Sequence, residues 1–337
     1  MFLYYGLDKF KCFTGLPACC GQQASNFSDV KSMHLGRFNA ISISGDGTAY
    51  LLGYCDVHDS HKSEHILGPK GVVSKAVLGA RAICIVTNSG EILHWRDVGG
   101  QPDSVTVSGP VQDVALGNED ALVLQKDGTV GIIIHSKLNV EPVTPLHNIV
   151  AVACGMAHNL ALTDGGAVFT WGCSNHGELG HGSLDSEEKP KVVEALEGLC
   201  VRKIAAGGWH SAAISAYDDL YLWGWNESGQ IGALHPSGSR PHKDSVNIAP
   251  LPVLFAALGD ASFLSVECGS RHTAVLTKSG SVYAWGNNTY GQLGVDEDIK
   301  TSHEPHEIQV PQGHTAVGLC CKFWGTLVKC KKIDKDS

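Results

Sequence analysis

The sequence predicts an all-β protein, a seven-bladed β-propeller closed by N-terminal strands that complete its last blade. The first observation is a repeat, because three segments share G-x-x-H, then W-G, then L-G or I-G. The second is a period-two alternation of apolar residues that ends in Gly/Asn turns, which is typical of short strands. One such repeat cannot bury its own apolar face, so its copies are expected to pack into a closed array. The three segments begin at Val150, Val201 and Leu264.

The glycine of the G-x-x-H turn marks the register of each copy. Three earlier segments have lost the His but keep a strand, a glycine turn and a second strand, and in a seventh copy Lys322 takes the place of the glycine. Seven copies of a four-stranded unit make a seven-bladed propeller. The six marker glycines are Gly36, Gly79, Gly117, Gly155, Gly207 and Gly269.

The seventh copy ends before its W-G strand, which would leave one blade incomplete. A matching segment lies near the N-terminus, where Tyr4 to Gly15 aligns with the W-G strand of the sixth copy. This alignment places Tyr5 on Trp285 and Gly6 on Gly286. Closing a ring with strands from both ends removes free sheet edges, so we expect the N-terminal segment to complete the final blade.

The predicted organisation is a single propeller over residues 1–330, in which residues 1–30 complete the final blade. A short charged tail is expected over 331–337. The longest connection, Ala233 to Ala261, is rich in proline and is predicted to be a flexible loop that leaves the fifth blade. Such a loop either contacts a partner or is a tolerated insertion.

Composition disfavours several classes of protein. A formal net charge of −9, with no basic run longer than Lys331-Lys332, argues against direct DNA binding. The N-terminal residues lack a basic n-region, and the apolar runs are too short to span a bilayer, so we expect neither secretion nor a membrane segment. Twelve cysteines occur without a C-x-x-C pair, which favours free thiols in a reduced, intracellular compartment. Three of them share one interior repeat position: Cys154, Cys268 and Cys321.

Two repeated residue types are predicted to serve the fold. The signature histidines are expected to hydrogen-bond neighbouring backbone in the turn. The tryptophans are expected to pack within the blades, with each indole N–H meeting a nearby carbonyl. These structural residues are His158, His210, His272, Trp171, Trp223 and Trp285.

The position just before the signature His recurs around the ring while its chemistry is free to vary. Tryptophan and arginine are prominent there, and both dominate the hot spots of protein interfaces. We expect this position to form a partner-binding patch at one mouth of the channel; the alternative is a packed apolar channel lining. From the first blade to the seventh, the position holds Phe38, Arg81, Glu119, Ala157, Trp209, Arg271 and Trp324.

A second departure from the repeat is Trp225-Asn226-Glu227. Sister copies have Cys173-Ser174-Asn175 and Asn287-Asn288-Thr289 at this turn. The extra tryptophan and acid are predicted to add to partner recognition, with a tryptophan that caps a blade edge as the alternative.

Catalytic and metal-binding patterns are weak. The sequence has no G-x-S-x-G elbow, phosphate loop, H-E-x-x-H motif or dinucleotide fingerprint, so we expect neither catalysis nor a cofactor. One connection is rich in possible metal ligands but has no matching pair and no rigid element to fix their geometry. We expect a solvated loop rather than a metal site at Cys55, Asp56, His58, Asp59, His61, Glu64 and His65.

The motifs G-x-x-H-x-x-x-x-T, V-x-x-W-G and G-x-L-G resemble the regulator of chromosome condensation repeat family. The match is strong over residues 149–294 and weaker over 31–135 and 313–333. The resemblance implies a non-enzymatic, monomeric propeller that partners a JmjC-domain oxygenase, as the regulatory subunit of a histone demethylase or hydroxylase. It also implies a nuclear and/or cytoplasmic protein that reaches histones and chromosomes through that partner.

Two other functions are open to a chain of this family. The rival is guanine-nucleotide exchange on a Ran-like small GTPase, the activity of the founding member, whose basic N-terminal tail has no counterpart in the nearly uncharged start of this sequence. The third is a scaffold domain of the kind found in ligases and membrane-traffic regulators. No second domain is recognisable here, which disfavours the third.

Overall fold

The computed structural model describes most of the 337-residue chain. The described residues are 1–6, 22–23, 30–37, 39–53, 65–67, 72–79, 82–95, 101–118, 121–134, 139–233, 247–296 and 298–333. Within these ranges, no helix has the length and apolar character needed to cross a membrane.

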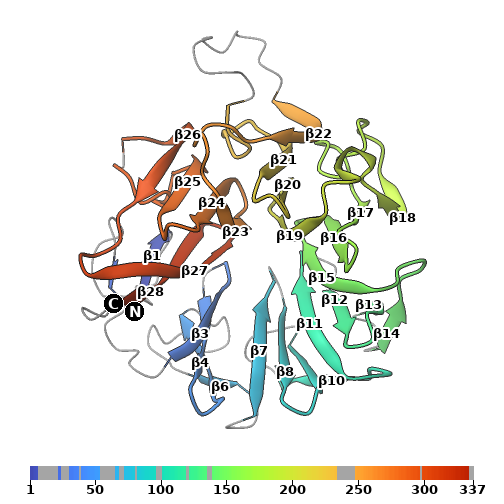
Figure 1. The fold of residues 1–337 in the computed structure, drawn as a ribbon. Helices are drawn as coiled ribbons and strands as arrows, with labels where there is room; N and C mark the ends of the chain where they lie inside the picture. The colour runs from blue at the N-terminus through green and yellow to red at the C-terminus, as the bar shows by residue number, and fades with distance from the viewer. Residues whose placement is uncertain are drawn as a thin grey trace.

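The chain folds into seven four-stranded antiparallel sheets arranged radially around a central axis (Figure 1), and the innermost strands line a central channel. The architecture is the predicted seven-bladed propeller. Blades 1 to 3 contain β3 (Val30–Leu35), β4 (Asn39–Ser44), β5 (Ala49–Gly53), β6 (His65–Leu67); β7 (Val73–Leu78), β8 (Ile83–Thr87), β9 (Ile92–Trp95), β10 (Asp103–Val105); and β11 (Val111–Leu116), β12 (Ala121–Gln125), β13 (Val130–Ile134), β14 (Asn139–Pro142).

Blades 4 to 6 repeat the same order of strands from the channel outward, and a short 3-10 helix, η1 (Glu194–Leu196), follows blade 4. Blade 7 takes strands from both ends of the chain. These blades contain β15 (Ile149–Cys154), β16 (His158–Thr163), β17 (Val168–Gly172), β18 (Glu187–Val192); β19 (Val201–Ala206), β20 (His210–Ser215), β21 (Leu220–Trp225), β22 (Ile248–Leu254); β23 (Phe263–Cys268), β24 (His272–Thr277), β25 (Val282–Asn287), β26 (Thr301–Ile308); and β27 (His314–Lys322), β28 (Gly325–Lys332), β1 (Phe2–Gly6), β2 (Gln22–Gln23).

The N-terminal strand β1 closes the ring in the predicted register. It pairs with β28, with Tyr5 opposite Thr326 and Gly6 opposite Gly325. In blade 6, Trp285 pairs with Thr273 as Tyr5 pairs with Thr326 in blade 7. Tyr5 and Gly6 thus occupy the positions that the W-G pair holds in blade 6. The two ends of the chain therefore lie side by side in one sheet (Figure 1). Strand β28 runs to Lys332, so it includes the first two residues of the predicted tail.

The apolar core is a ring rather than a single centre. Among the described residues, the buried apolar side chains form seven clusters, and each cluster joins two neighbouring blades. The W-G tryptophans follow this rule, since Trp171, Trp223 and Trp285 each join the cluster shared with the preceding blade. A blade therefore completes its burial only beside its neighbours, as expected for a repeat architecture.

Each innermost strand changes register near its start. In blade 2, Val73 is buried between blades, and two residues later Lys75 lines the channel. In blade 5 the same step separates Val201 from Lys203. Because a β-bulge re-aims the side chains that follow it, polar residues line the channel although the strands begin in the core.

The predicted flexible loop from Ala233 to Ala261 is wrong in part. Residues 248–254 form β22, the outermost strand of blade 5, which pairs with β21. Prolines 250 and 252 suggested a loop, but an edge strand has one side without partners and tolerates residues that lack an N–H. Residues 234–246 lie outside the described ranges.

The shared cysteine position is interior, as predicted. Cys154, Cys268 and Cys321 are buried near the ends of the innermost strands of blades 4, 6 and 7. All the cysteines that the structure describes are free thiols. Buried free cysteine packs as a small hydrophobe.

Removing residues 2–6 is expected to destabilise the propeller strongly, because β1 contributes four buried side chains to the clusters on both sides of blade 7. At about 1.5–3 kcal/mol per buried side chain, the loss is at least about 6 kcal/mol. Thermal melting measures it. Leu3→Ala alone should cost about 2–4 kcal/mol, whereas Val317→Ala, an exposed control in the same blade, should change stability by less than about 0.5 kcal/mol. An unchanged melting curve for the truncated chain would contradict closure by β1.

Candidate partner-binding site

The signature histidines join neighbouring blades through hydroxyl groups. The Nε2 atoms of His158, His210 and His272 lie 2.9, 2.9 and 3.0 Å from a Ser or Thr hydroxyl in the next blade. That hydroxyl donates in turn to a backbone carbonyl of the blade from which the His comes. The hydroxyls belong to Ser211, Thr273 and Thr326, and the carbonyls to Glu178, Gln230 and Gln292.

The geometry of these consecutive hydrogen bonds fixes the tautomer of the histidine ring. A carbonyl oxygen only accepts, so the hydroxyl of Ser211 must give its proton to the Glu178 carbonyl, 2.8 Å away. The hydroxyl oxygen then accepts from the Nε2–H of His158. The prediction that these histidines bond backbone in their own turn is therefore wrong, because their rings reach across the blade interface to a side chain.

The tryptophans are structural as predicted. The indole N–H groups of Trp223 and Trp285 donate to the carbonyls of Glu178 and Gln230, at 2.9 and 3.1 Å. Each carbonyl thus receives both the Trp and the Ser or Thr of the next blade. The signature histidines and the tryptophans of blades 5 and 6 are consequently held in hydrogen bonds between neighbouring blades.

The position before the His carries a different kind of contact. In blades 5 and 6, Trp209 and Arg271 lie at the turn face, the end of the propeller where the G-x-x-H turns and the loops after the W-G strands meet. The Trp209 and Trp225 rings meet edge to face, with centroids 5.4 Å apart. The guanidinium carbon of Arg271 lies 4.4 Å from the centroid of the Trp225 ring and 5.9 Å from that of Trp209. We call Trp209, Trp225, Arg271 and His176 the Trp–Arg cluster.

His176 was not predicted, and it completes the cluster. Its ring centroid lies 5.0 Å from that of Trp225 and 6.0 Å from that of Trp209. In blade 6 the same repeat position holds Tyr290, whose ring contacts Trp324 of blade 7 at 5.5 Å. The repeat thus brings this loop residue of one blade against the residue before the His position of the next blade. The sequence did contain a signal for His176, because His176 and Tyr290 are ring-bearing residues at the same position of the repeat.

The remaining predicted site residues have different fates. Asn226 is buried, and its amide holds the turn by accepting from Ile231 N and donating to Gly232 O, both at 3.0 Å. Glu227 is exposed beside the cluster. Trp324 is half-buried and packs against Tyr290. It is not one of the residues in contact within the Trp–Arg cluster. Three further positions of the predicted ring lie outside the described residues: Phe38, Arg81 and Glu119.

The Trp–Arg cluster has one positively charged side chain, Arg271, that forms no ion pair with a described residue. The Nε of Arg271 is buried without a hydrogen-bond partner, and within the described ranges no carboxylate forms an ion pair with this side chain. Burial lowers the pKa of His176, with Glu227 opposing and Arg271 adding to the shift. His176 is therefore neutral near pH 7. A half-buried guanidinium stacked on tryptophan, with unused donors, is suited to bind an acidic or carbonyl group of another protein.

The described residues contain no group of three or more His, Cys, Asp and Glu side chains placed to hold a metal ion. The ligand-rich connection at 55–64 lies outside the described ranges, as does the side chain of His65. Its predicted solvated state stays a prediction.

The fold and the repeat-encoded contacts define a seven-bladed β-propeller whose blades are joined by His, Trp and hydroxyl contacts. The chain belongs to the regulator of chromosome condensation (RCC1) repeat family. One model of this repeat matches residues 165–214, 217–276 and 279–321. A second model of the repeat matches residues 149–178, 201–230 and 263–292.

Two curated relatives carry the name RCC1 domain-containing protein 1. The chain is 32% identical to the Homo sapiens protein over 251 residues, which are 64% of this chain and 66% of the relative. It is 35% identical to the Mus musculus protein over 223 residues, 58% of this chain and 59% of the relative. The match thus spans about three fifths to two thirds of the length of these relatives.

A solved structure supports the fold. Prp20p of Saccharomyces cerevisiae, described with its binding to Gsp1p and histones, superimposes with a TM-score of 0.82 at 20% identity. The superposition covers 99% of this chain and 92% of Prp20p. At this identity the likeness concerns the architecture.

The three signature histidines, which are buried, are expected to make the protein acid-labile. Burial lowers the pKa of His158 and His210 to about 3 and that of His272 to about 4, against about 6.5 in the unfolded chain. The unfolded state therefore binds more protons between these values, so stability is complete above about pH 6.5 and is lost as pH falls toward 4. At pH 5 the loss is about 2 kcal/mol per histidine.

Urea unfolding as a function of pH measures this dependence. His210→Gln keeps an N–H that can donate to Thr273 but removes one titrating group, so the slope of stability against pH between 4.5 and 6 should fall by about 1 kcal/mol per pH unit. His147→Gln is the control, because His147 is exposed and its replacement should leave the slope as it is. An unchanged slope for His210→Gln would contradict the neutral, buried state of this ring.

Proposed function

We propose that the protein is a non-enzymatic interaction propeller that docks a protein partner on its turn face, at the Trp–Arg cluster. The observation that carries the proposal is that some residues of the repeat are buried between blades while their neighbours in sequence lie at the surface. His210 and Trp223 are buried in contacts between blades, whereas Trp209, Trp225 and Arg271 are half-buried at the turn face and form no hydrogen bond with a side chain of the described residues. Tryptophan and arginine in this setting are the residues that most often dominate binding energy.

The partner that we propose is a JmjC-domain oxygenase. The support is the likeness to RCC1 domain-containing protein 1, because resemblance to that protein implies such a partner. The chain would act as the regulatory subunit of a histone demethylase or hydroxylase, in histone-methylation control. Its place would be nuclear and/or cytoplasmic, on chromosomes through the partner, since a net charge of −9 disfavours direct contact with DNA.

The alternative function is guanine-nucleotide exchange on a Ran-like GTPase. Its support is the shared propeller of Prp20p, which is described with its binding to Gsp1p. A fold-level likeness does not carry an activity. We therefore prefer the function implied by RCC1 domain-containing protein 1, whose likeness to this chain rests on 32–35% sequence identity rather than on fold alone.

Binding of the propeller to a purified JmjC-domain oxygenase tests the proposal, with isothermal titration calorimetry as the measurement. Trp209→Ala and Arg271→Glu should each weaken binding by about 30-fold or more, as expected for hot-spot residues. Tyr217→Ala is the matched control, because Tyr217 is 78% exposed in the β20–β21 hairpin at the other end of blade 5. Wild-type affinity in both cluster variants would refute docking at this site.

A nucleotide-release assay separates the two functions. The proposed function predicts that the propeller leaves the release rate of a Ran-type GTPase unchanged. Acceleration by several orders of magnitude would favour the exchange-factor alternative.

A further inference from the structure

Lys322 is the exception at a repeated position of the channel wall. In the other six blades this position is the marker glycine. In blade 5 the ring of His210 lies against that glycine, and a Cβ on Gly207 would meet its Cε1 at 2.2 Å. In blade 7 the place of the His is taken by Gly325, which pairs with Gly6 as His272 pairs with Gly286. The missing ring gives Lys322 the room for a side chain.

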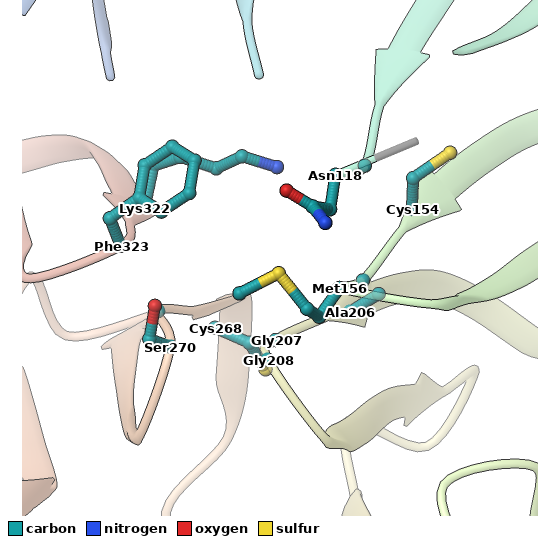
Figure 2. Close-up of a pocket in the computed structure, with 13 residues that line it drawn as sticks. Asn118, Cys154, Met156, Ala206, Gly207, Gly208, Cys268, Ser270, Lys322 and Phe323 are labelled. Carbon is teal, nitrogen blue, oxygen red and sulfur yellow. The ribbon is translucent and has the colours of Figure 1, made fainter. Parts of the chain in front are cut away.

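The side chain of Lys322 crosses the channel from blade 7 to blade 3. Its Nζ donates to the backbone carbonyl of Leu116 at 2.8 Å. Figure 2 shows it extending from the end of β27 toward Asn118. Two cavities meet at this side chain, and Cys154 and Cys268 line both of them. The cavity toward the turn face has a volume of about 20 Å³, and the cavity along the innermost strands has about 510 Å³.

Small side chains form one part of the wall of the larger cavity. Ala115, Ala153 and Ala205 line it from the innermost strands of blades 3, 4 and 5, at one level of the repeat. Farther along, Lys75 and Lys203 line the same cavity, and their side chains are 36% and 32% exposed. The cavity is therefore open to solvent at that end, and its volume falls within the range of small-molecule sites, about 300–1,000 Å³.

The acidic groups of this cavity are already paired. Asp113 forms an ion pair with Lys75. Glu267 pairs with Lys203 at 2.9 Å, and the same ammonium donates to Ser265 at 2.6 Å. These two carboxylates and two ammonium groups cancel in charge, so the net charge of the cavity depends on Lys322 and on Arg202 at the wall.

Arg202 is committed to Asp218 at 2.9 Å, but Lys322 has no close ion pair among the described residues, since Glu267 pairs with Lys203 and acts on Lys322 only from a longer distance. Within the described part of the chain Lys322 pairs with no carboxylate, and its hydrogen bond goes to a neutral carbonyl. Its ammonium thus keeps unused N–H donors in the channel. Burial lowers the pKa of Lys322. An anion placed beside the ammonium would offset this cost of burial.

We propose that the 510 Å³ cavity binds a small anion, a molecule with one phosphate or carboxylate group that contacts the Lys322 ammonium and a small body that rests on the alanine wall. The site is built by two exchanges within one copy of the repeat, a lysine for the marker glycine and a glycine for the signature His. It lies inside the channel and is separate from the Trp–Arg cluster.

Isothermal titration calorimetry of the full chain tests this site, with inorganic phosphate in one arm and succinate in the other, at constant ionic strength against chloride. We expect saturable binding of at least one of the two anions with one site per chain, and the responding arm identifies the anionic group. Lys322→Met should weaken that binding by about 10- to 100-fold, as for a lost charge-assisted hydrogen bond. Lys329→Met is the control, because this exposed lysine on β28 faces outward and donates to Lys31 O.

A second variant keeps the test decisive if Lys322→Met does not fold. Ala153→Leu narrows the cavity at the alanine wall without changing any charge, and it should also weaken binding. Absence of saturable binding of both anions to the wild-type protein would overturn the proposal. Binding by Lys322→Met or by Ala153→Leu with wild-type affinity would equally overturn it.

Discussion

The hydrogen-bond chain from His through hydroxyl to carbonyl is the interaction on which the arrangement of blades 4 to 7 depends. Each link uses a His and a carbonyl from one blade and a hydroxyl from the next, as in His210, Thr273 and Gln230. All of these groups are buried, and a buried polar group without its partner is costly. Neighbouring blades therefore have one spacing and one register that satisfy the whole set.

The other half of the ring is held differently. In blades 1 and 2 the place of the signature His is taken by Asn39 and Ala82, and the interfaces between blades 1, 2 and 3 are clusters of mainly aliphatic side chains. Apolar packing needs no directional partner. Apolar clusters thus join all neighbouring blades, and the interfaces between blades 4 and 7 add directional hydrogen bonds. The full G-x-x-H motif is accordingly found in the three copies whose His makes these bonds.

Much of the fold was predictable because it is encoded in each copy. Strand alternation and turn glycines gave the blades, and the match of Tyr5 to Trp285 gave the closure, since both depend on local pattern. The partner of each His was not predictable, because His158 meets a hydroxyl 53 residues away on another blade. The prolines of β22 led to the wrong prediction of a loop. Proline is tolerated there because β22 is an edge strand, and its place at the edge is known only from the order of strands in the sheet.

The candidate site was predictable in part for the same reason. Trp209 and Arg271 stood out because they vary at a repeated position, but His176 entered only when the structure placed the loop of blade 4 against blade 5. Lys322 also varies at a repeated position, and its meaning depends on the channel that the ring encloses. Sequence comparison between copies finds such exceptions, and the three-dimensional neighbours decide what they do.

The central claim is that adjacent residues of one turn serve different purposes, His210 the fold and Trp209 the surface. Urea unfolding of His210→Ala and Trp209→Ala, side by side near neutral pH, tests it most directly. We expect His210→Ala to lose about 2–4 kcal/mol through a buried cavity and broken hydrogen bonds, and Trp209→Ala to lose about 1 kcal/mol or less. Equal or greater destabilisation by Trp209→Ala would contradict the claim.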